Sequence, residues 1–127
     1  MTLDTPANKR LLIVDDAPAN LRVLAEILMD AYEISVATSG PEALEIAASG
    51  DPDRTPDLVL LDIMMPEMDG YEVCRRLRRE SDTRDLPVVF VTANTDDKTL
   101  EEAFEAGGTD YVRKPVNRIE LLARIKS

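Results

Sequence analysis

Residues 58–62 read LVLLD, a run of four apolar residues that ends in an aspartate. Residues 11–16 read LLIVDD and have the same form, with Asp15 and Asp16 after the apolar run. The interior of a buried strand does not easily hold a carboxylate, but its end does. The two runs therefore predict that two strands bring an acidic trio (Asp15, Asp16 and Asp62) to one edge of a sheet. Such a cluster binds a hard divalent cation, or one member is a nucleophile, or both.

Predicted strands and helices alternate along the chain around these two runs. The strands are expected at residues 10–15, 32–38, 57–62, 87–92 and 109–113. The helices are expected at residues 18–30, 40–50, 71–80, 96–106 and 117–127. This alternation predicts an α/β fold with a doubly wound, five-stranded parallel sheet and helices on both faces. Three of the strands are apolar throughout, as expected when both faces are covered.

The composition is that of one globular domain with an acidic surface. The chain has 127 residues, 44% of them apolar, and its 15 basic and 25 acidic residues give a net charge of −10. That charge argues against a general surface for nucleic acid or for anionic membranes. No stretch approaches the roughly 20 apolar residues that span a bilayer. A solvated acidic exterior explains most of the charges, but it does not explain the acidic trio.

Two further features exclude classes of site and indicate a compartment. The sequence has no histidine, which excludes histidine-based triads and histidine-liganded zinc. Its one cysteine, Cys74, cannot form an internal disulfide and is expected to be an ordinary buried thiol. Residues 1–10 lack the apolar core of a signal peptide. We therefore expect a cytoplasmic protein.

Other polar residues follow the ends of the predicted strands, where ligands bind in open α/β sheets. Thr92 ends the strand at 87–92, and Lys114 and Pro115 follow the strand at 109–113. These residue types suit phosphoryl chemistry. Carboxylates, a backbone carbonyl and waters suit Mg²⁺, and a carboxylate can attack phosphorus to form an acyl phosphate. A lysine and a threonine hydroxyl can each contact a phosphoryl oxygen.

Each of these residues also has an ordinary structural interpretation. Thr92 alone would more often be a helix cap, and Lys114 alone would more often be a solvated lysine. Asp69 is expected to cap the helix that begins near Gly70. The acidic trio resists such an interpretation, because clustered carboxylates repel one another unless a cation is present. Given the trio, we interpret Thr92 and Lys114 as parts of the same site.

Four motifs, taken together, resemble the receiver domain of two-component response regulators, including its chemotaxis members. They read VDD at residues 14–16, LDIMMPEMDG at 61–70, VTA at 91–93 and YVRKP at 111–115. Each motif is weak alone, but the set is highly specific and covers nearly the whole chain in the right order and spacing. The resemblance implies a flavodoxin-like three-layer sandwich with strand order 2-1-3-4-5, in which the first and third strands are neighbours.

The resemblance also implies how the chain is divided. We expect an N-terminal lead over residues 1–9 and one receiver domain over residues 10–127. The last predicted helix stops without a terminal cap, a pattern compatible with a fragment of a longer regulator.

The resemblance implies a role for each residue of the predicted metal site. Asp62 matches the phosphoacceptor, and Asp16 matches the direct ligand of Mg²⁺ or Mn²⁺. Asp15 acts on the metal largely through water, and Met64 offers its backbone carbonyl. Met64 and Asn94 are positions at which the family varies, and they line the path of attacking water.

The resemblance further implies a switch. Thr92 matches the hydroxyl that turns toward the phosphoryl group, and Tyr111 matches the aromatic residue that rotates inward as Thr92 moves. Lys114 matches the lysine that contacts the phosphoryl group, and Pro115 matches a proline that follows a cis peptide bond. Leu100 and Phe104 are expected to form the signalling face together with Tyr111, although both also fit a plain core.

The function that these matches imply is a phosphorylation-activated signalling switch. A histidine kinase or a phosphotransfer protein presents phosphohistidine, and Asp62 takes the phosphoryl group. The face made by the fourth helix, the fifth strand and the fifth helix then changes. It controls an output domain, an effector protein or a phosphorylation-linked homodimer. The chain assists its own modification but is a signalling module rather than a metabolic enzyme, and we expect no direct contact with nucleic acid or membrane.

Three other classes of protein share some of these residues. A phosphatase of the haloacid dehalogenase type normally needs a second aspartate two residues after the nucleophile, where this sequence has Met64. A flavodoxin-like electron carrier needs a phosphate-binding loop after the first strand, where residues 15–20 are acidic. A degenerate receiver kept only for binding would lack part of the residue set, which is complete here.

Overall fold

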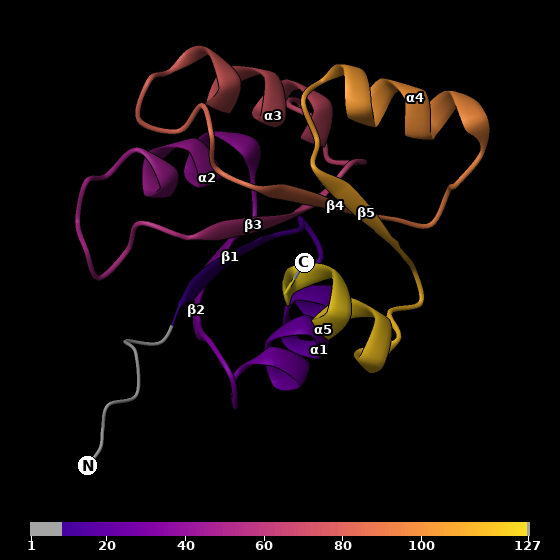
Figure 1. Ribbon diagram of the computed structural model, residues 1–127, viewed down its shortest axis with the longest axis horizontal. Coiled ribbons are helices and arrows are strands. Elements are labelled where there is room, and N and C mark those ends of the chain that lie inside the picture. The colour runs from indigo at the N-terminus through magenta and orange to yellow at the C-terminus, as the bar shows by residue number, and fades with distance from the viewer. Residues whose placement is uncertain (1–8, 127) are drawn as a thin grey trace.

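The computed structural model describes residues 9–126, in which five parallel strands alternate with five helices (Figure 1). The strands are β1 (Arg10–Val14), β2 (Glu33–Ala37), β3 (Leu58–Asp62), β4 (Val88–Thr92) and β5 (Asp110–Arg113). The helices are α1 (Pro18–Leu28), α2 (Gly40–Ala47), α3 (Gly70–Arg79), α4 (Asp97–Glu105) and α5 (Arg118–Lys126). Every predicted element is present. Of the lead at residues 1–9 only Lys9 is described, and Ser127 also lies outside the described residues.

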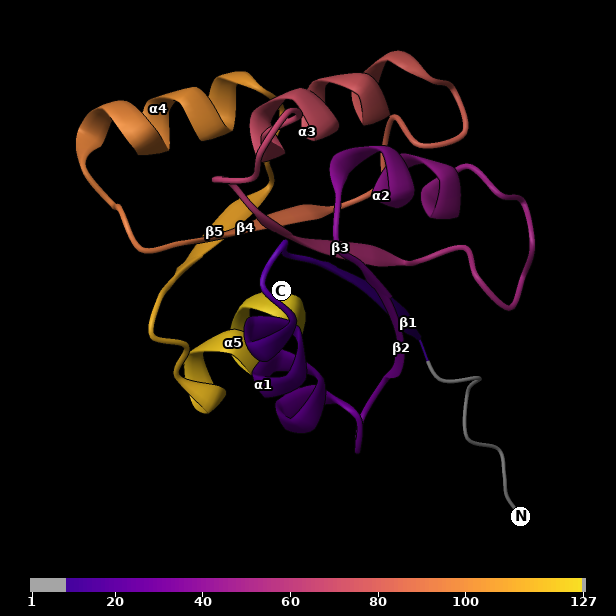
Figure 2. The same ribbon diagram turned by 180° about the vertical axis from the view of Figure 1, so that it is seen from behind.

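The strands form one sheet with the order β2-β1-β3-β4-β5, which confirms the predicted order. The sheet lies between two helical layers, with α1 and α5 on one face and α2, α3 and α4 on the other (Figures 1 and 2). Each face has its own core. Leu12 and Val14 of β1 face the layer of α2 and α3, whereas Leu11 and Ile13 face α1 and α5. The predicted three-layer sandwich is therefore confirmed.

The burial of the strands explains why their sequences differ. Every residue of β3 and of β4 is buried, as expected for central strands covered on both faces. The edge strand β2 exposes Glu33 and Val36 and is correspondingly more polar. Cys74 is buried in α3, and this burial raises the pKa of its thiol, as expected for an unreactive core residue. Within residues 9–126, no helix has the length and apolar character to cross a bilayer.

The start of α3 is packed directly against the end of β3. Asp69 caps the helix by accepting a hydrogen bond from the backbone N–H of Glu72 at 2.9 Å, as predicted. Gly70 donates from its backbone N–H to the carbonyl of Ile63 at 2.8 Å. A Cβ atom at Gly70 would collide with the carbonyl oxygen of Asp62 and would lie 2.9 Å from the Cα of Ile63. Only glycine therefore allows α3 to begin this close to the strand end.

Gly70→Ala is expected to lower the free energy of unfolding by about 3 kcal/mol, the upper end of the range for overpacking, because backbone rather than a flexible side chain must move. Gly50→Ala is the matched control. Gly50 has a φ of +73° but no atom within 4 Å of the added Cβ, so the expected cost is only about 1 kcal/mol of backbone strain. Urea unfolding of both variants measures the difference. Equal costs would contradict the close approach at Gly70.

Candidate functional site

The carboxyl ends of β1 and β3 bring the acidic trio together. Val14 pairs with Leu61, so the residues that follow them, Asp15 and Asp62, are neighbours across the two strands. One carboxylate oxygen from each of Asp15, Asp16 and Asp62 lies within 4.8 Å of the others. Asp15 and Asp62 are buried, whereas Asp16 is exposed. The site thus has a buried floor and an open acidic edge.

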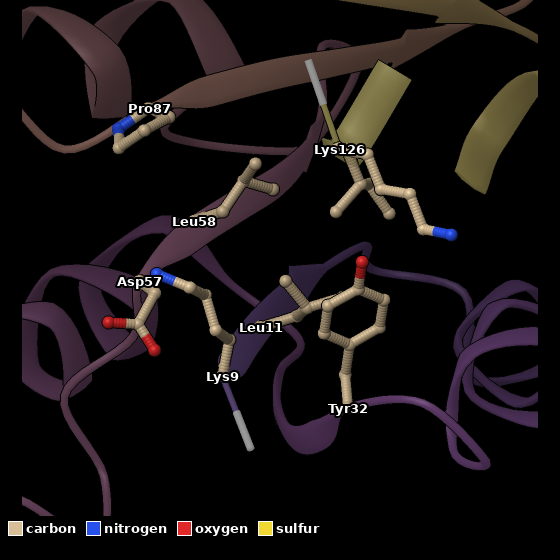
Figure 3. Close-up of a pocket in the computed structure, with 8 residues that line it drawn as sticks. Lys9, Leu11, Tyr32, Asp57, Leu58, Pro87 and Lys126 are labelled. Atoms are coloured by element: carbon tan, nitrogen blue, oxygen red, sulfur yellow. The ribbon is translucent and has the colours of Figure 1, made fainter. Parts of the chain in front are cut away.

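A hollow of about 430 Å³ lies at the opposite end of the sheet (Figure 3). Leu11 and Leu58 line it near the starts of β1 and β3, together with Tyr32, Lys9 and Lys126. Ligand sites in open α/β sheets lie at the carboxyl ends of the strands. Since the acidic trio lies at that end, we place the candidate site there rather than in this hollow.

Lys114 reaches two members of the acidic trio. Its Nζ donates to Oδ1 of Asp62 at 3.2 Å and to Oδ2 of Asp15 at 3.4 Å. Burial raises the pKa of the Asp62 carboxyl, and the charge of Asp15 raises it further, while Lys114 opposes both effects. Burial lowers the pKa of Lys114, but the two carboxylates outweigh burial and raise it overall. Lys114 therefore stays protonated and offsets only part of the negative charge.

The two aspartates after β1 have different surroundings. The Asp15 carboxylate accepts from the backbone N–H of Ala17 at 2.9 Å, from Nδ2 of Asn20 at 3.1 Å and from Lys114. The Asp16 carboxylate accepts no hydrogen bond from any described part of the protein. The oxygens of Asp15 are therefore fixed in place, whereas those of Asp16 are open to a cation.

These residues fit a hard divalent cation. All the side-chain ligands are carboxylate oxygens, which Mg²⁺ and Mn²⁺ prefer. Three negative charges face the single positive charge of Lys114, so these groups alone do not neutralise the cluster. Met64 lies in the loop after β3 and is 78% exposed, so its thioether side chain points to solvent rather than into the cluster. Only its backbone carbonyl is a candidate ligand.

Thr92 and Tyr111 occupy the neighbouring strands β4 and β5. Thr92 is buried, and its hydroxyl donates to the carbonyl of Asn94 and accepts from the N–H of Asn94, both at 3.0 Å. The half-buried Tyr111 ring packs edge-on against Phe104 of α4, with ring centroids 6.5 Å apart. The Thr92 hydroxyl is thus engaged by its own loop, and Tyr111 is engaged by α4.

The segment after β5 is tied to the end of β4. The backbone N–H of Lys114 donates to the carbonyl of Thr92 at 2.9 Å, and the peptide bond between Lys114 and Pro115 is cis, the isomer that the resemblance implies. The hydrogen bond to Thr92 holds the backbone of Lys114 at the end of β4, and from there its side chain reaches Asp15 and Asp62.

Asn20 is the residue of this site that the sequence interpretation missed. Pro18 begins α1, so Asn20 falls in the first turn of the helix, close to the end of β1. A side chain in the first turn of a helix can reach back to the strand end that precedes the helix. Without the fold, however, an exposed asparagine in a helix carries no such meaning.

The expected signalling face is only partly buried. Ala103 is the buried residue of α4, while Phe104 is 50% exposed and Leu100 is half-buried. Phe104 is therefore not a plain core residue. The helix is also joined to α3 by Tyr71, whose hydroxyl donates to the carbonyl of Thr99 at 3.1 Å.

Comparisons with known proteins agree with this geometry. The family model of the response regulator receiver domain matches residues 11–126. Response regulator PleD of Caulobacter vibrioides is 43% identical over 119 residues, which are 93% of this chain and 25% of PleD. The chain spans between about a quarter and a half of the length of the curated relatives that it matches.

Solved structures give the same result. The chemotaxis protein CheY4 of Vibrio cholerae has a TM-score of 0.86 at 30% identity, covering 94% of this chain and 98% of CheY4. The receiver domain of sensor histidine kinase PA1611 from Pseudomonas aeruginosa has a TM-score of 0.83 at 30% identity, covering 94% of this chain and 96% of that domain. The PA1611 domain is described with a magnesium ion coordinated in its active site cleft.

Proposed function

Because the chain belongs to the response regulator receiver domain family, we propose that it is a phosphorylation-dependent switch in which Asp62 accepts the phosphoryl group. The donor is a phosphohistidine on a histidine kinase or on a phosphotransfer protein. The observation that carries the proposal is the placement of Asp62 at a buried strand end, 3.2 Å from the ammonium of Lys114 and beside two further carboxylates.

The residues of the site divide the chemistry among them. An oxygen of the Asp62 carboxylate attacks phosphorus, and a phosphorus–oxygen bond forms as the phosphorus–nitrogen bond of the donor breaks. Asp16, Asp15, Asp62 and the Met64 carbonyl would hold Mg²⁺ or Mn²⁺, which when bound offsets negative charge on the phosphoryl oxygens. Lys114 supplies positive charge to another phosphoryl oxygen.

The proposed output is a change in the face formed by α4, β5 and α5. In the structure, the Thr92 hydroxyl is hydrogen-bonded to the backbone of Asn94. A phosphoryl oxygen on Asp62 offers that hydroxyl a charged acceptor, which is a stronger partner than a neutral carbonyl. Movement of Thr92 then frees space for the Tyr111 ring, which now contacts Phe104. The altered face acts on an output domain, an effector protein or a second copy of the chain.

The beryllofluoride complex with Mg²⁺, which imitates an acyl phosphate, should perturb the amide chemical shifts of residues 92–112 well beyond the immediate site. A population shift of this kind needs only a few kcal/mol of differential interaction. Thr92→Val removes the hydroxyl and keeps the shape, so its perturbation should stay near Asp62. Two-dimensional NMR measures both. Shifts confined to the site in the wild-type protein would indicate a phosphoryl acceptor without a switch.

Mg²⁺ should stabilise the fold by relieving repulsion within the acidic trio. At a concentration ten times its dissociation constant, the expected gain in the free energy of unfolding is about 1.4 kcal/mol. Thermal unfolding in MgCl₂, compared with KCl of equal ionic strength, separates binding from screening. An equal melting temperature in the two salts would count against the metal site.

The alternative functions fit these residues less well. A dehalogenase-type phosphatase would use the side chain two residues after Asp62, but the Met64 side chain is apolar and exposed. A flavodoxin-like carrier would bind phosphate after β1, where the buried Asp15 carboxylate would repel it.

We further propose that the receiver domain spans residues 10–127 and acts in the cytoplasm. The activity of the whole regulator then depends on the partner that binds the face formed by α4, β5 and α5.

A further inference from the structure

The Asp15 carboxylate is held by three hydrogen-bond donors from different parts of the chain. Its Oδ1 accepts from the backbone N–H of Ala17, and its Oδ2 accepts from Asn20 and from Lys114. The side chain of Asp15 is almost fully buried, so these protein groups rather than water set its orientation. Asn20 is thus one of only two side chains in the described chain that bond to this carboxylate.

The second side-chain donor, Lys114, is shared between two acceptors. It lies 3.2 Å from Asp62 and 3.4 Å from Asp15. Under the proposed function, Lys114 contacts an oxygen of the phosphoryl group on Asp62, a charged acceptor that competes with Asp15 for the same ammonium. Ala17 serves the other oxygen, so Asn20 is the side-chain donor to Oδ2 of Asp15 that this competition leaves in place.

The chemistry of Asn20 suits this position. Its amide donates a hydrogen bond without adding positive charge, whereas a lysine or arginine there would compete with a divalent cation for the acidic trio. Asn20 also lines a hollow of about 240 Å³ together with Lys114 and Pro115, so it faces the same space as the lysine. Groups that donate hydrogen bonds to a metal-binding side chain typically fix the orientation of that side chain, and this orientation affects the affinity for the metal.

We propose that Asn20 is a positioning residue for the divalent cation, acting through Asp15. The proposal rests on the proposed function, because it needs a metal at the acidic trio. The competing interpretation is a purely structural bond that ties the start of α1 to the end of β1. The helix has no side-chain cap at Ala17, so such a bond would matter for stability.

The test compares Asn20→Leu and Asn20→Ala, neither of which can donate, with Ala19→Leu as the matched control. Ala19 is exposed in the same turn. Alanine favours the helix more than asparagine does, so a lost affinity in Asn20→Ala cannot be assigned to a weaker α1. Calorimetric titration with Mg²⁺ measures the dissociation constant, and the melting temperature in EDTA reports the structural contribution.

The dissociation constant for Mg²⁺ should rise about tenfold in both Asn20 variants and stay within twofold in Ala19→Leu. The half-saturating Mg²⁺ concentration for phosphorylation should rise in parallel, while the rate at saturating Mg²⁺ stays within about twofold of the wild-type value. In a Lys114→Ala background, Asn20→Leu should raise the dissociation constant by a larger factor, because it then removes the last side-chain donor.

An Mg²⁺ dissociation constant within twofold of the wild-type value in both Asn20 variants would overturn the proposal, whether or not the melting temperature falls. The wild-type protein separates this failure from that of the proposed function. If the wild-type chain binds Mg²⁺ and is phosphorylated at Asp62 while the Asn20 variants bind equally well, only the role of Asn20 is lost. If the wild-type chain does neither, both proposals fall.

Discussion

Asp62→Asn is expected to abolish the uptake of a phosphoryl group from acetyl phosphate in the presence of Mg²⁺. The amide is a far weaker nucleophile than the carboxylate. Asp15 is the other buried carboxylate that contacts Lys114, but its oxygens are already held by Ala17 and Asn20, whereas Asp62 has Lys114 alone as its donor within residues 9–126. Intact-protein mass measurement should show one added phosphoryl group on the wild-type chain and none on the variant. Asp57→Asn, just before the start of the same strand, is the matched control and should be labelled normally.

The melting temperature of Asp62→Asn distinguishes the loss of the nucleophile from misfolding of the variant. Burial first, and then the charge of Asp15, raises the folded-state pKa of Asp62. The resulting penalty is absent below the ordinary carboxyl pKa of about 4. It grows as the pH rises toward the raised value and is fully present above that value. Asparagine removes the penalty, so the melting temperature of Asp62→Asn in EDTA at neutral pH should equal or exceed that of the wild-type protein. The difference should shrink toward pH 4.

Labelling of Asp62→Asn to the wild-type extent would mean that another residue is the acceptor. If the variant is unlabelled and also melts well below the wild-type protein in EDTA, misfolding would explain the lost phosphorylation. That result would also contradict the unfavourable burial of the Asp62 carboxylate described above.

Asp16→Ala is expected to reduce Mg²⁺-supported phosphorylation by about a hundredfold or more, because a catalytic cation contributes several kcal/mol of charge stabilisation. Asp16 is the exposed member of the acidic trio, and its oxygens are free of hydrogen bonds within residues 9–126. The two remaining carboxylates are already bonded to Lys114. Initial labelling rates across an Mg²⁺ titration should approach the rate that the wild-type protein shows in EDTA.

Asp30→Ala is the control for this change, since it removes the same charge from an exposed position just beyond the other end of α1. It should keep both the wild-type rate and the wild-type dependence on Mg²⁺. An Asp16→Ala protein that is labelled at the full Mg²⁺-supported rate would show that the direct metal ligand has been assigned wrongly.

The parts of the fold that the sequence predicted are those governed by local pattern. Apolar runs that end in carboxylates located β1 and β3, and the alternation of elements gave the three layers. The end of α2 was less predictable. Gly50 suggested a stop, but the helix already ends at Ala47, and Gly50 adopts its positive φ in the following loop. A glycine near a helix end does not fix which residue is last.

The parts of the site that could not be predicted depend on distances between elements. Asn20 lies five positions after Asp15 in the sequence, and only the packing of α1 beside β1 shows that its amide reaches that carboxylate. The exposure of Phe104 likewise depends on how α4 lies on the sheet, because its helical spacing fits both core and surface. Residue types at strand ends identified the chemistry, but the supporting contacts required the fold.

The most direct test of Asp62 as the phosphoryl acceptor is to locate the acyl phosphate in the wild-type chain. After reaction with acetyl phosphate and Mg²⁺, borohydride reduces an acyl phosphate of aspartate to the corresponding alcohol, homoserine, which peptide mass spectrometry can place. We expect homoserine at position 62 and at no other aspartate, with none formed when EDTA replaces Mg²⁺. Homoserine at position 15 or 16, or a phosphoryl group that resists reduction on another residue, would contradict this assignment of the acceptor.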